Sequence, residues 1–280
     1  MLTTTLSINP EAIQDQTLWE NYLKSRDRMC GRIGRSNRRH SSIENTMKVP
    51  NSDWRRISGF DEMVVIKDDE HTALVAANVT MEKLVEATQR RRFIPKVVDG
   101  HRLTTVVDAF ARAANAPSFS QFETFDSSVL TIEIVHDNGQ VLTLSTDPRY
   151  EHNLLRHAGA LPGRITMLEV ALIPAGPSVE VLYTPVFLGA GSLLRSIPAY
   201  DATQYVEYFV MNKNSYMLIT GSLSPVSHPP PVYRDTFGDH VNFVWQNISL
   251  SGFSHVEILP IANYLFRYDD CRVVQGSKTW

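Results

Sequence analysis

Short apolar runs separated by polar turns dominate the hydrophobic pattern of this chain, and helical periodicity is confined to a few segments. The pattern over residues 63–76, in which two apolar runs flank a charged turn, predicts a β-hairpin. Thr80 stands directly before residues 81–92, whose apolar positions Leu84 and Val85 face one side of a helix. We therefore expect a helix with Thr80 as its N-cap, because a threonine hydroxyl can accept a hydrogen bond from a backbone N–H group of the first turn.

Strand-like patterns also dominate the rest of the chain. Asn138-Gly139 lies between apolar runs at 130–135 and 140–144, which is a strong hairpin signal. A cluster rich in proline and glycine at 173–177 ends the next predicted strand, 165–172, and indicates a domain boundary. Further strands are expected at 178–185, 205–210, 216–220, 241–249 and 255–259, and helical segments at 10–25, 148–157 and 201–206. Because strands and helices mix without a regular βαβ alternation, the predicted fold class is α+β.

The composition is that of an ordinary globular protein and excludes few classes of function. Hydrophobic residues make up 43% of the 280 residues and charged residues 20%, and the formal net charge of -3 gives no overall case for nucleic-acid binding. No apolar run approaches the roughly 20 residues that a membrane-spanning helix requires, and the N-terminus lacks a signal-peptide pattern. Cys30 and Cys271 lie far apart and make no metal-ligand spacing. We therefore expect a cytoplasmic protein with no membrane span, no bound metal and no nucleic-acid partner.

Several segments carry motifs that occur together, in the same order, in one family of enzymes. These segments are Ile33–Arg39, Asn78–Thr88, Glu133–Gly139, Glu169–Ala175 and Ile258–Asp269. The last of them, ILPIANYLFRYD, is long and rarely arises by chance. The chain thus resembles the Δ24-sterol reductase-like group of FAD-dependent oxidoreductases, which have the FAD-binding PCMH-type fold of the vanillyl-alcohol-oxidase superfamily. The resemblance implies a flavin domain over residues 1–175 and an antiparallel cap domain, truncated relative to the family, over residues 176–280.

The chain departs from this family where the family contacts its flavin. The family's T-V-G-G-G turn, whose glycines let the backbone approach the pyrophosphate, is here Thr105-Val106-Val107-Asp108-Ala109. Val107 adds bulk, and Asp108 adds a negative charge where the resemblance places a dianion. The corresponding segments at 112–118 and 158–166 have also lost glycines or gained proline. We therefore expect no cofactor, and the alternative is FAD bound through altered loops.

A cleft that has lost its flavin would be apolar, with a few polar anchors. The expected substrate-binding residues are Val107, Phe110, Phe119, Phe122 and Phe125. The expected catalytic residues, which would polarise a carbonyl group or hold a carboxylate, are His101, Arg102, Asp108 and Arg112. Each apolar residue is alternatively part of the core, and Arg112 is alternatively an ion-pair partner of Asp108 at helical spacing.

The leading functional hypothesis is a cofactor-independent enzyme of secondary metabolism that folds a hydrophobic intermediate for intramolecular cyclisation, as a Diels–Alderase or another pericyclase does. Such a reaction needs a shaped cavity and at most one hydrogen bond to a carbonyl group. The first alternative is an FAD-dependent oxidoreductase acting on a C–C bond of a hydrophobic substrate. The second is a non-catalytic binding partner of a full-length homologue. The expected ligand is a hydrophobic small molecule, and a short cap would leave surface for a second copy to cover, which favours a homo-oligomer.

Overall fold

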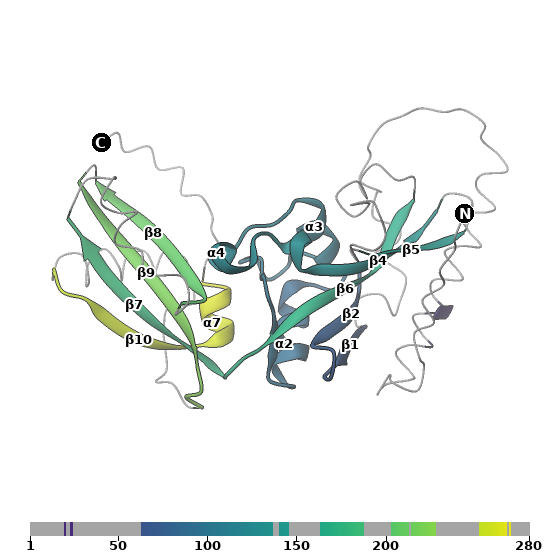
Figure 1. The fold of residues 1–280 in the computed structure, drawn as a ribbon, viewed down its shortest axis with the longest axis horizontal. Helices are drawn as coiled ribbons and strands as arrows, with labels where there is room; N and C mark the ends of the chain where they lie inside the picture. The colour runs from purple at the N-terminus through teal and green to yellow at the C-terminus, as the bar shows by residue number, and fades with distance from the viewer. Residues whose placement is uncertain are drawn as a thin grey trace. The chain divides into compact units, whose positions relative to one another are not determined.

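The chain forms two compact units (Figure 1). The computed structural model describes residues 20, 23–24, 63–136, 140–145, 163–187, 203–212, 214–227, 252–267 and 269. The first unit consists of Met1–Lys96, Leu103–Ala114 and Phe125–Ile173, and the second of Val97–Arg102, Asn115–Thr124 and Pro174–Trp280. The two-domain division predicted after residue 175 stays a prediction. Helices and antiparallel sheets are both present, which confirms the α+β class.

The first unit is built on a six-stranded sheet. Its strands follow the order β1-β2-β6-β4-β5, and β3 pairs with β6 beside this path. Their bounds are β1 Val64–Lys67, β2 Thr72–Ala76, β3 Phe93–Pro95, β4 Val129–Val135, β5 Val141–Ser145 and β6 Arg164–Pro174. The antiparallel pairs β1–β2 and β4–β5 confirm the two predicted hairpin pairings.

Helix α2 (Met81–Gln89) follows β2 and begins as predicted. The Thr80 hydroxyl accepts a hydrogen bond from the Lys83 backbone N–H at 3.3 Å, so Thr80 is the N-cap. The buried residues of the helix are Met81, Leu84, Val85 and Thr88, which includes the predicted apolar face. The prediction ended this helix at Arg92, whereas the helix ends three residues earlier. The reason is that Arg92 turns the chain with φ of 61° and β3 begins directly after it.

Two short helical segments complete the first unit. Helix α3 (Val106–Ala111) has Thr105 as its N-cap, and the 3₁₀ helix η3 (Phe125–Ser128) contacts it. Thr80 and Thr105 form an isolated antiparallel bridge. The starts of α2 and α3 are therefore joined through their backbones.

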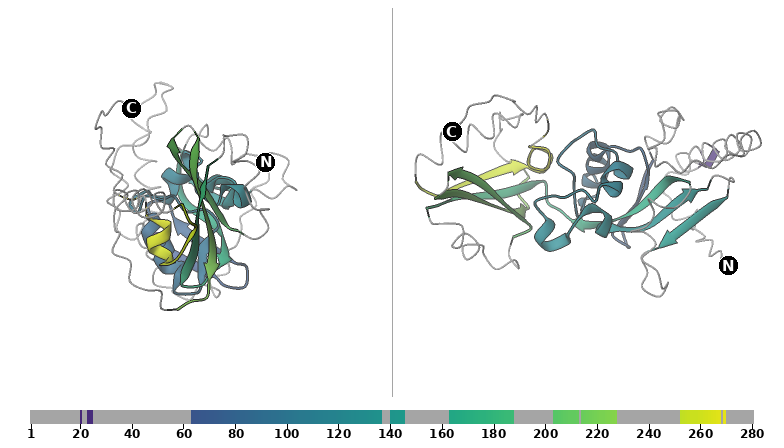
Figure 2. Two further views of the ribbon diagram at one scale, coloured as in Figure 1. Left: turned by 90° about the vertical axis from the view of Figure 1, so that its left-hand side faces the viewer. Right: turned by 90° about the horizontal axis from the view of Figure 1, so that it is seen from above.

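The second unit is built on a four-stranded antiparallel sheet in the order β10-β7-β9-β8. Its strands are β7 Ser178–Val186, β8 Tyr205–Asn212, β9 Ser215–Ser224 and β10 His255–Pro260. Helix α4 (Phe119–Phe122) contacts β8, and helix α7 (Ile261–Leu265) contacts β7 and β10. Helix α7, drawn in yellow, continues directly from β10 (Figure 2).

The predicted helical segment at 201–206 is wrong where the structure describes it. Tyr205 and Val206 begin β8 and pair with Gly221 and Thr220 of β9. Aromatic and β-branched residues suit a pleated surface, and pairing with β9 decides between the two patterns. The segments predicted at 148–157 and 241–249 lie outside the described residues, as does the helix at 10–25 except for Glu20, Leu23 and Lys24, which are helical. No helix in the described part of the chain is long and apolar enough to cross a membrane.

Candidate functional site

The predicted catalytic residues are divided between the two units. His101 and Arg102 belong to the second unit, and Asp108 and Arg112 belong to the first. The two pairs therefore belong to separate units.

Arg102 is held by the segment that follows helix α7. Its Nε lies 3.1 Å from Asp269 Oδ2, and its backbone N–H donates to Asp269 Oδ1 at 3.3 Å. The guanidinium carbon lies 4.8 Å from the centre of the Phe266 ring, close enough for a cation–π contact. Asp269 is itself fixed, because its N–H donates to the Phe266 carbonyl at 3.0 Å. The result is a positioned guanidinium that is still partly exposed.

His101 lies beside the same carboxylate and is open to solvent. Its backbone N–H donates at 3.0 Å to Oδ1 of the buried residue Asp99, which fixes the loop. Its Nδ1 lies 4.0 Å from Asp269 Oδ1, and its side chain is 54% exposed. A ligand could therefore reach the imidazole, which can donate a hydrogen bond or exchange a proton.

Asp108 and Arg112 lie on helix α3, and the contact between them involves the backbone. Arg112 Nε donates to the Asp108 carbonyl oxygen at 3.3 Å, while the Asp108 carboxylate accepts from the Thr105 hydroxyl at 2.7 Å. The Thr105 hydroxyl in turn accepts from the Asp108 N–H at 3.2 Å. These contacts close the first turn of α3, as an N-cap does.

The backbone N–H groups at the start of α3 are all occupied. Val106 N–H donates to the Val79 carbonyl at 2.9 Å, and Val107 N–H to the Ala77 carbonyl at 3.1 Å. The N–H groups of the next two residues, Asp108 and Ala109, donate to the side chain and the carbonyl of Thr105. A phosphate loop works by pointing such donors at the ligand, and here they point at the protein.

The predicted substrate-binding residues differ in exposure and in unit. In the first unit, Phe125 is fully buried, Phe110 is nearly so, and Val107 is half-buried. In the second unit, Phe119 is 51% exposed and Phe122 is half-buried, both on α4. Phe119 is thus the most accessible of the five to a ligand.

A buried polar network in the second unit was not among the predicted site residues. Arg267 forms a salt bridge with Glu207, donates to the Tyr264 carbonyl, and has its guanidinium carbon 3.8 Å from the centre of the Tyr264 ring. The Tyr264 ring lies 4.9 Å from that of Tyr205. Gly221 makes room for both rings, because a Cβ there would lie 3.0 Å from the Tyr264 hydroxyl and 3.2 Å from Tyr205. Burial raises the pKa of Tyr205, and the charge of Arg267 opposes that rise.

The sequence did contain a signal for these residues. The motif that ends in Tyr-Leu-Phe-Arg-Tyr-Asp supplies Tyr264 and Arg267 to the buried network, and Phe266 and Asp269 to the contact with Arg102. In the sequence alone the motif indicates a resemblance and specifies no contact. The contacts of these four residues depend on the turn at the end of α7, which the sequence pattern did not predict.

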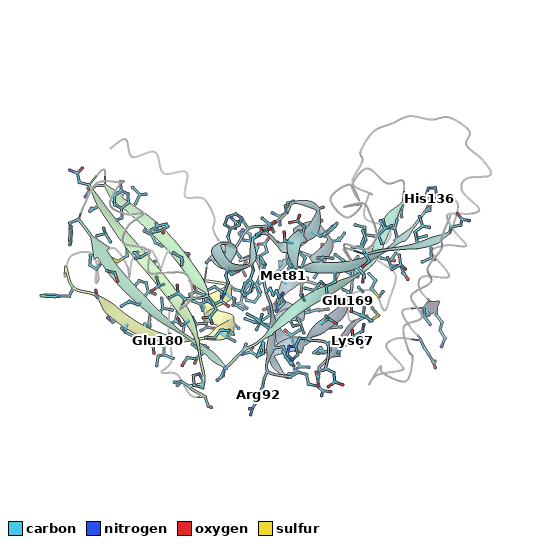
Figure 3. All side chains as sticks on the ribbon, viewed as in Figure 1. Lys67, Met81, Arg92, His136, Glu169 and Glu180 are labelled. Atoms are coloured by element: carbon cyan, nitrogen blue, oxygen red, sulfur yellow. The ribbon has the colours of Figure 1, made fainter. Side chains whose placement is uncertain are left out.

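In the first unit, Glu169 joins neighbouring strands of the sheet. Glu169 and Lys67 are labelled in Figure 3. Glu169 accepts hydrogen bonds from Lys67 Nζ on β1 at 2.9 Å, the Thr72 hydroxyl on β2 at 3.1 Å, and the Thr131 hydroxyl on β4 at 2.9 Å. Burial acts to lower the pKa of Lys67, but Glu169 and then Glu70 outweigh it, so the pKa of Lys67 is raised. The arrangement favours the charged form of Lys67 and is best explained as a structural cross-link.

Comparisons with known proteins give no further assignment. Neither a scan against protein-family models nor a search of the curated proteins finds a match to this chain. Among the residues that the structure describes, no group of three or more His, Cys, Asp or Glu residues could hold a metal ion.

Proposed function

We propose that this chain is a cofactor-independent enzyme of secondary metabolism that folds a hydrophobic intermediate for an intramolecular cyclisation of the Diels–Alder type. The proposed scaffold is an FAD-binding PCMH-type fold in which residues 176–280 form the truncated antiparallel cap. On this proposal the ancestral flavin site has been lost and the protein uses shape and hydrogen bonding alone. The protein is proposed to act in the cytoplasm.

The main support for the proposal comes from the backbone hydrogen bonds in the first turn of α3. All the N–H groups from Val106 to Ala109 already donate within the protein, and the Asp108 carboxylate stands among them. A pyrophosphate there would find no backbone donor and would meet a like charge, which is costly in a poorly solvated site. The residues at this turn therefore do not fit FAD.

The backbone at Ala113 supports descent from a glycine-containing loop. Ala113 has φ of 47°, in the left-handed region that glycine adopts readily and other residues rarely adopt. It lies in the segment where the resembled family carries glycines. If a glycine of a flavin loop were replaced during evolution, the left-handed backbone conformation could remain while the residue type changed, as at Ala113.

The chemistry needs a shaped cavity and at most one positioned donor to a carbonyl group of the substrate. A Diels–Alder cyclisation forms two C–C bonds within the substrate and transfers no proton or electron to the protein. A hydrogen bond from His101 or Arg102 to a carbonyl group conjugated with the alkene would make that alkene more electron-poor in the transition state. Asp269 acts as a positioning residue, because it orients Arg102 through two contacts.

The first experiment tests flavin binding and catalysis together. Purified protein is examined by absorption spectroscopy before and after addition of FAD, and is then incubated with linear polyenes that carry an activated alkene. We expect no flavin band and a cyclised product whose stereoisomer ratio differs from that of the spontaneous reaction. Arg102→Lys and His101→Gln should return the ratio toward the spontaneous value. A bound flavin, or an unchanged ratio with the unmodified protein, would contradict the proposal.

A second candidate function, the non-catalytic binding partner, is favoured by one feature of the second sheet. Leu182 and Val256 are exposed and lie directly opposite each other on one face, and Val210 on the same face is also exposed. Exposed apolar residues in a group indicate a surface that contacts another molecule. The two functions differ in turnover, since a non-catalytic partner would leave the product ratio of the polyenes at its spontaneous value. Light scattering tests the surface itself, since a chain that self-associates through it has a mass that rises with concentration and a Leu182→Lys variant should lose that association.

A further inference from the structure

Strand β5 forms an open edge of the first unit's sheet. It lies at one end of the strand order and pairs with β4 alone. Next to it, the His136 N–H donates to the Gln140 carbonyl at 2.8 Å, which sets the hydrogen-bonding pattern of the two strands. Because hydrogen bonding alternates along an antiparallel pair, Leu142 bonds to β4, and the N–H and C=O groups of Val141 and Thr143 point away from β4. No described residue bonds to these four groups.

Strand β5 also lacks the residues that usually protect the edge of a sheet. Edge strands commonly carry charged residues or proline, which discourage pairing with another chain. Among the described strands with a neighbour on one side only, each of the others contains such a residue: Lys67 in β1, Pro95 in β3, Glu207 in β8 and Glu257 in β10. The sequence of β5, VLTLS, contains none, and Val141 is 38% exposed. This edge is therefore suited to pairing with a further strand.

The open groups are arranged so that β5 can pair with a second copy of itself. If the two strands are antiparallel and Leu142 lies opposite Leu142 of the second copy, Val141 of each copy lies opposite Thr143 of the other. Each of these pairs exchanges two N–H···O=C bonds, so all the open groups are used. A register moved by two residues toward the end of the strand would instead require Ser145, which already has other contacts. No like charges meet, because β5 carries no charged side chain.

We propose that β5 is a dimerisation strand, which pairs with β5 of a second copy of this chain about a two-fold axis at Leu142. The two sheets of the first units then form one continuous sheet. Two-fold dimers are the commonest oligomers, and every copy supplies the matching edge. The inference does not rest on the proposed cyclase activity, and it concerns a different sheet from the one that exposes Leu182 and Val256.

The first arm of the test measures the mass of the protein by light scattering as its concentration rises. We expect the mass to approach that of a dimer, and the mass of Thr143→Pro to stay that of a monomer. Proline at this position removes an N–H group that points away from β4, so the hydrogen bonds between β4 and β5 remain. Thr143→Val is the matched control, because it removes the hydroxyl group but keeps the N–H, and it should dimerise as the parent does. A parent that stays monomeric up to its solubility limit, or a Thr143→Pro variant that dimerises, would overturn the proposal.

The second arm tests the register by disulfide cross-linking and needs no proline in the strand. Both variants are made in a chain whose Cys30 and Cys271 are replaced by serine. In the proposed register the two Cα atoms at position 142 lie about 4.5 Å apart, which a disulfide can span, so Leu142→Cys should form a covalent dimer on oxidation. Leu144→Cys lies on the same face of the same strand but about 14 Å from its copy, so it should stay monomeric. Equal cross-linking of the two variants, or none in either, would refute the proposal.

Discussion

The backbone of Glu123 gives the sharpest test of the described geometry. Glu123 ends helix α4 with φ of 60° and ψ of -134°, a region that is essentially restricted to glycine. Its side chain is exposed, while its N–H donates to the Phe119 carbonyl at 2.8 Å, so the conformation is imposed by the turn. Replacing Glu123 with glycine should therefore relieve strain at an exposed position.

The expected gain follows from two opposing terms. A non-glycine residue in such a region costs about 1–3 kcal/mol, and the greater freedom of glycine in the unfolded chain costs about 0.5–1 kcal/mol. Glu123→Gly should thus stabilise the protein by about 1 kcal/mol. With a urea m-value of about 2 kcal/mol per molar, the unfolding midpoint should rise by about 0.5 M.

The matched control is Glu123→Ala, which removes the same carboxylate but keeps the Cβ that causes the strain. The difference between the two variants isolates the backbone term from any surface contact of the glutamate. If the glycine variant is no more stable than the alanine variant, the strain assigned to this turn is absent. Ala113→Gly should act in the same direction, because φ at Ala113 is 47°.

The remaining predictions concern stability and its pH dependence. Glu169→Gln should destabilise the protein by about 2 kcal/mol in urea unfolding, because it weakens the hydrogen bond from a charged Lys67. A double variant that also carries Lys67→Met should lose less stability than the sum of the losses in the two single variants. Tyr205→Phe should reduce the loss of stability in alkali. Burial raises the pKa of Tyr205 above its usual 10.0. The neutral phenol therefore contributes fully to the free energy of unfolding below pH 10, and this contribution is lost as the pH rises above that value. An alkaline unfolding curve identical to that of the unmodified protein would contradict this. Gly163→Ala should cost more than about 1 kcal/mol, because φ is 145° and a Cβ would lie 2.7 Å from the Ile134 side chain; a calorimetric Tm equal to that of the parent would count against it.

A sequence motif identifies several residues of the site but not the residues that they contact. The Tyr-Leu-Phe-Arg-Tyr-Asp segment is visible in the sequence, but its partners Arg102 and Glu207 lie 167 and 60 residues away from Asp269 and Arg267. No local pattern specifies such contacts, because they are made when separate strands and loops meet. Asn78 is a similar case, since only the three-dimensional structure shows that its side-chain oxygen is buried and has no hydrogen-bond partner among the described residues.

Local chemistry determined much of the secondary structure in advance. The alternation around residues 63–76 predicted the β1–β2 hairpin, and Thr80 predicted the start of α2, because periodicity and capping depend on neighbouring residues alone. Tertiary pairing decided the elements whose local pattern was ambiguous. Tyr205 and Val206 became strand because β9 supplied hydrogen-bond partners, and the turn at Thr105 became the start of a helix because the carbonyls of the β2–α2 turn accepted its N–H groups.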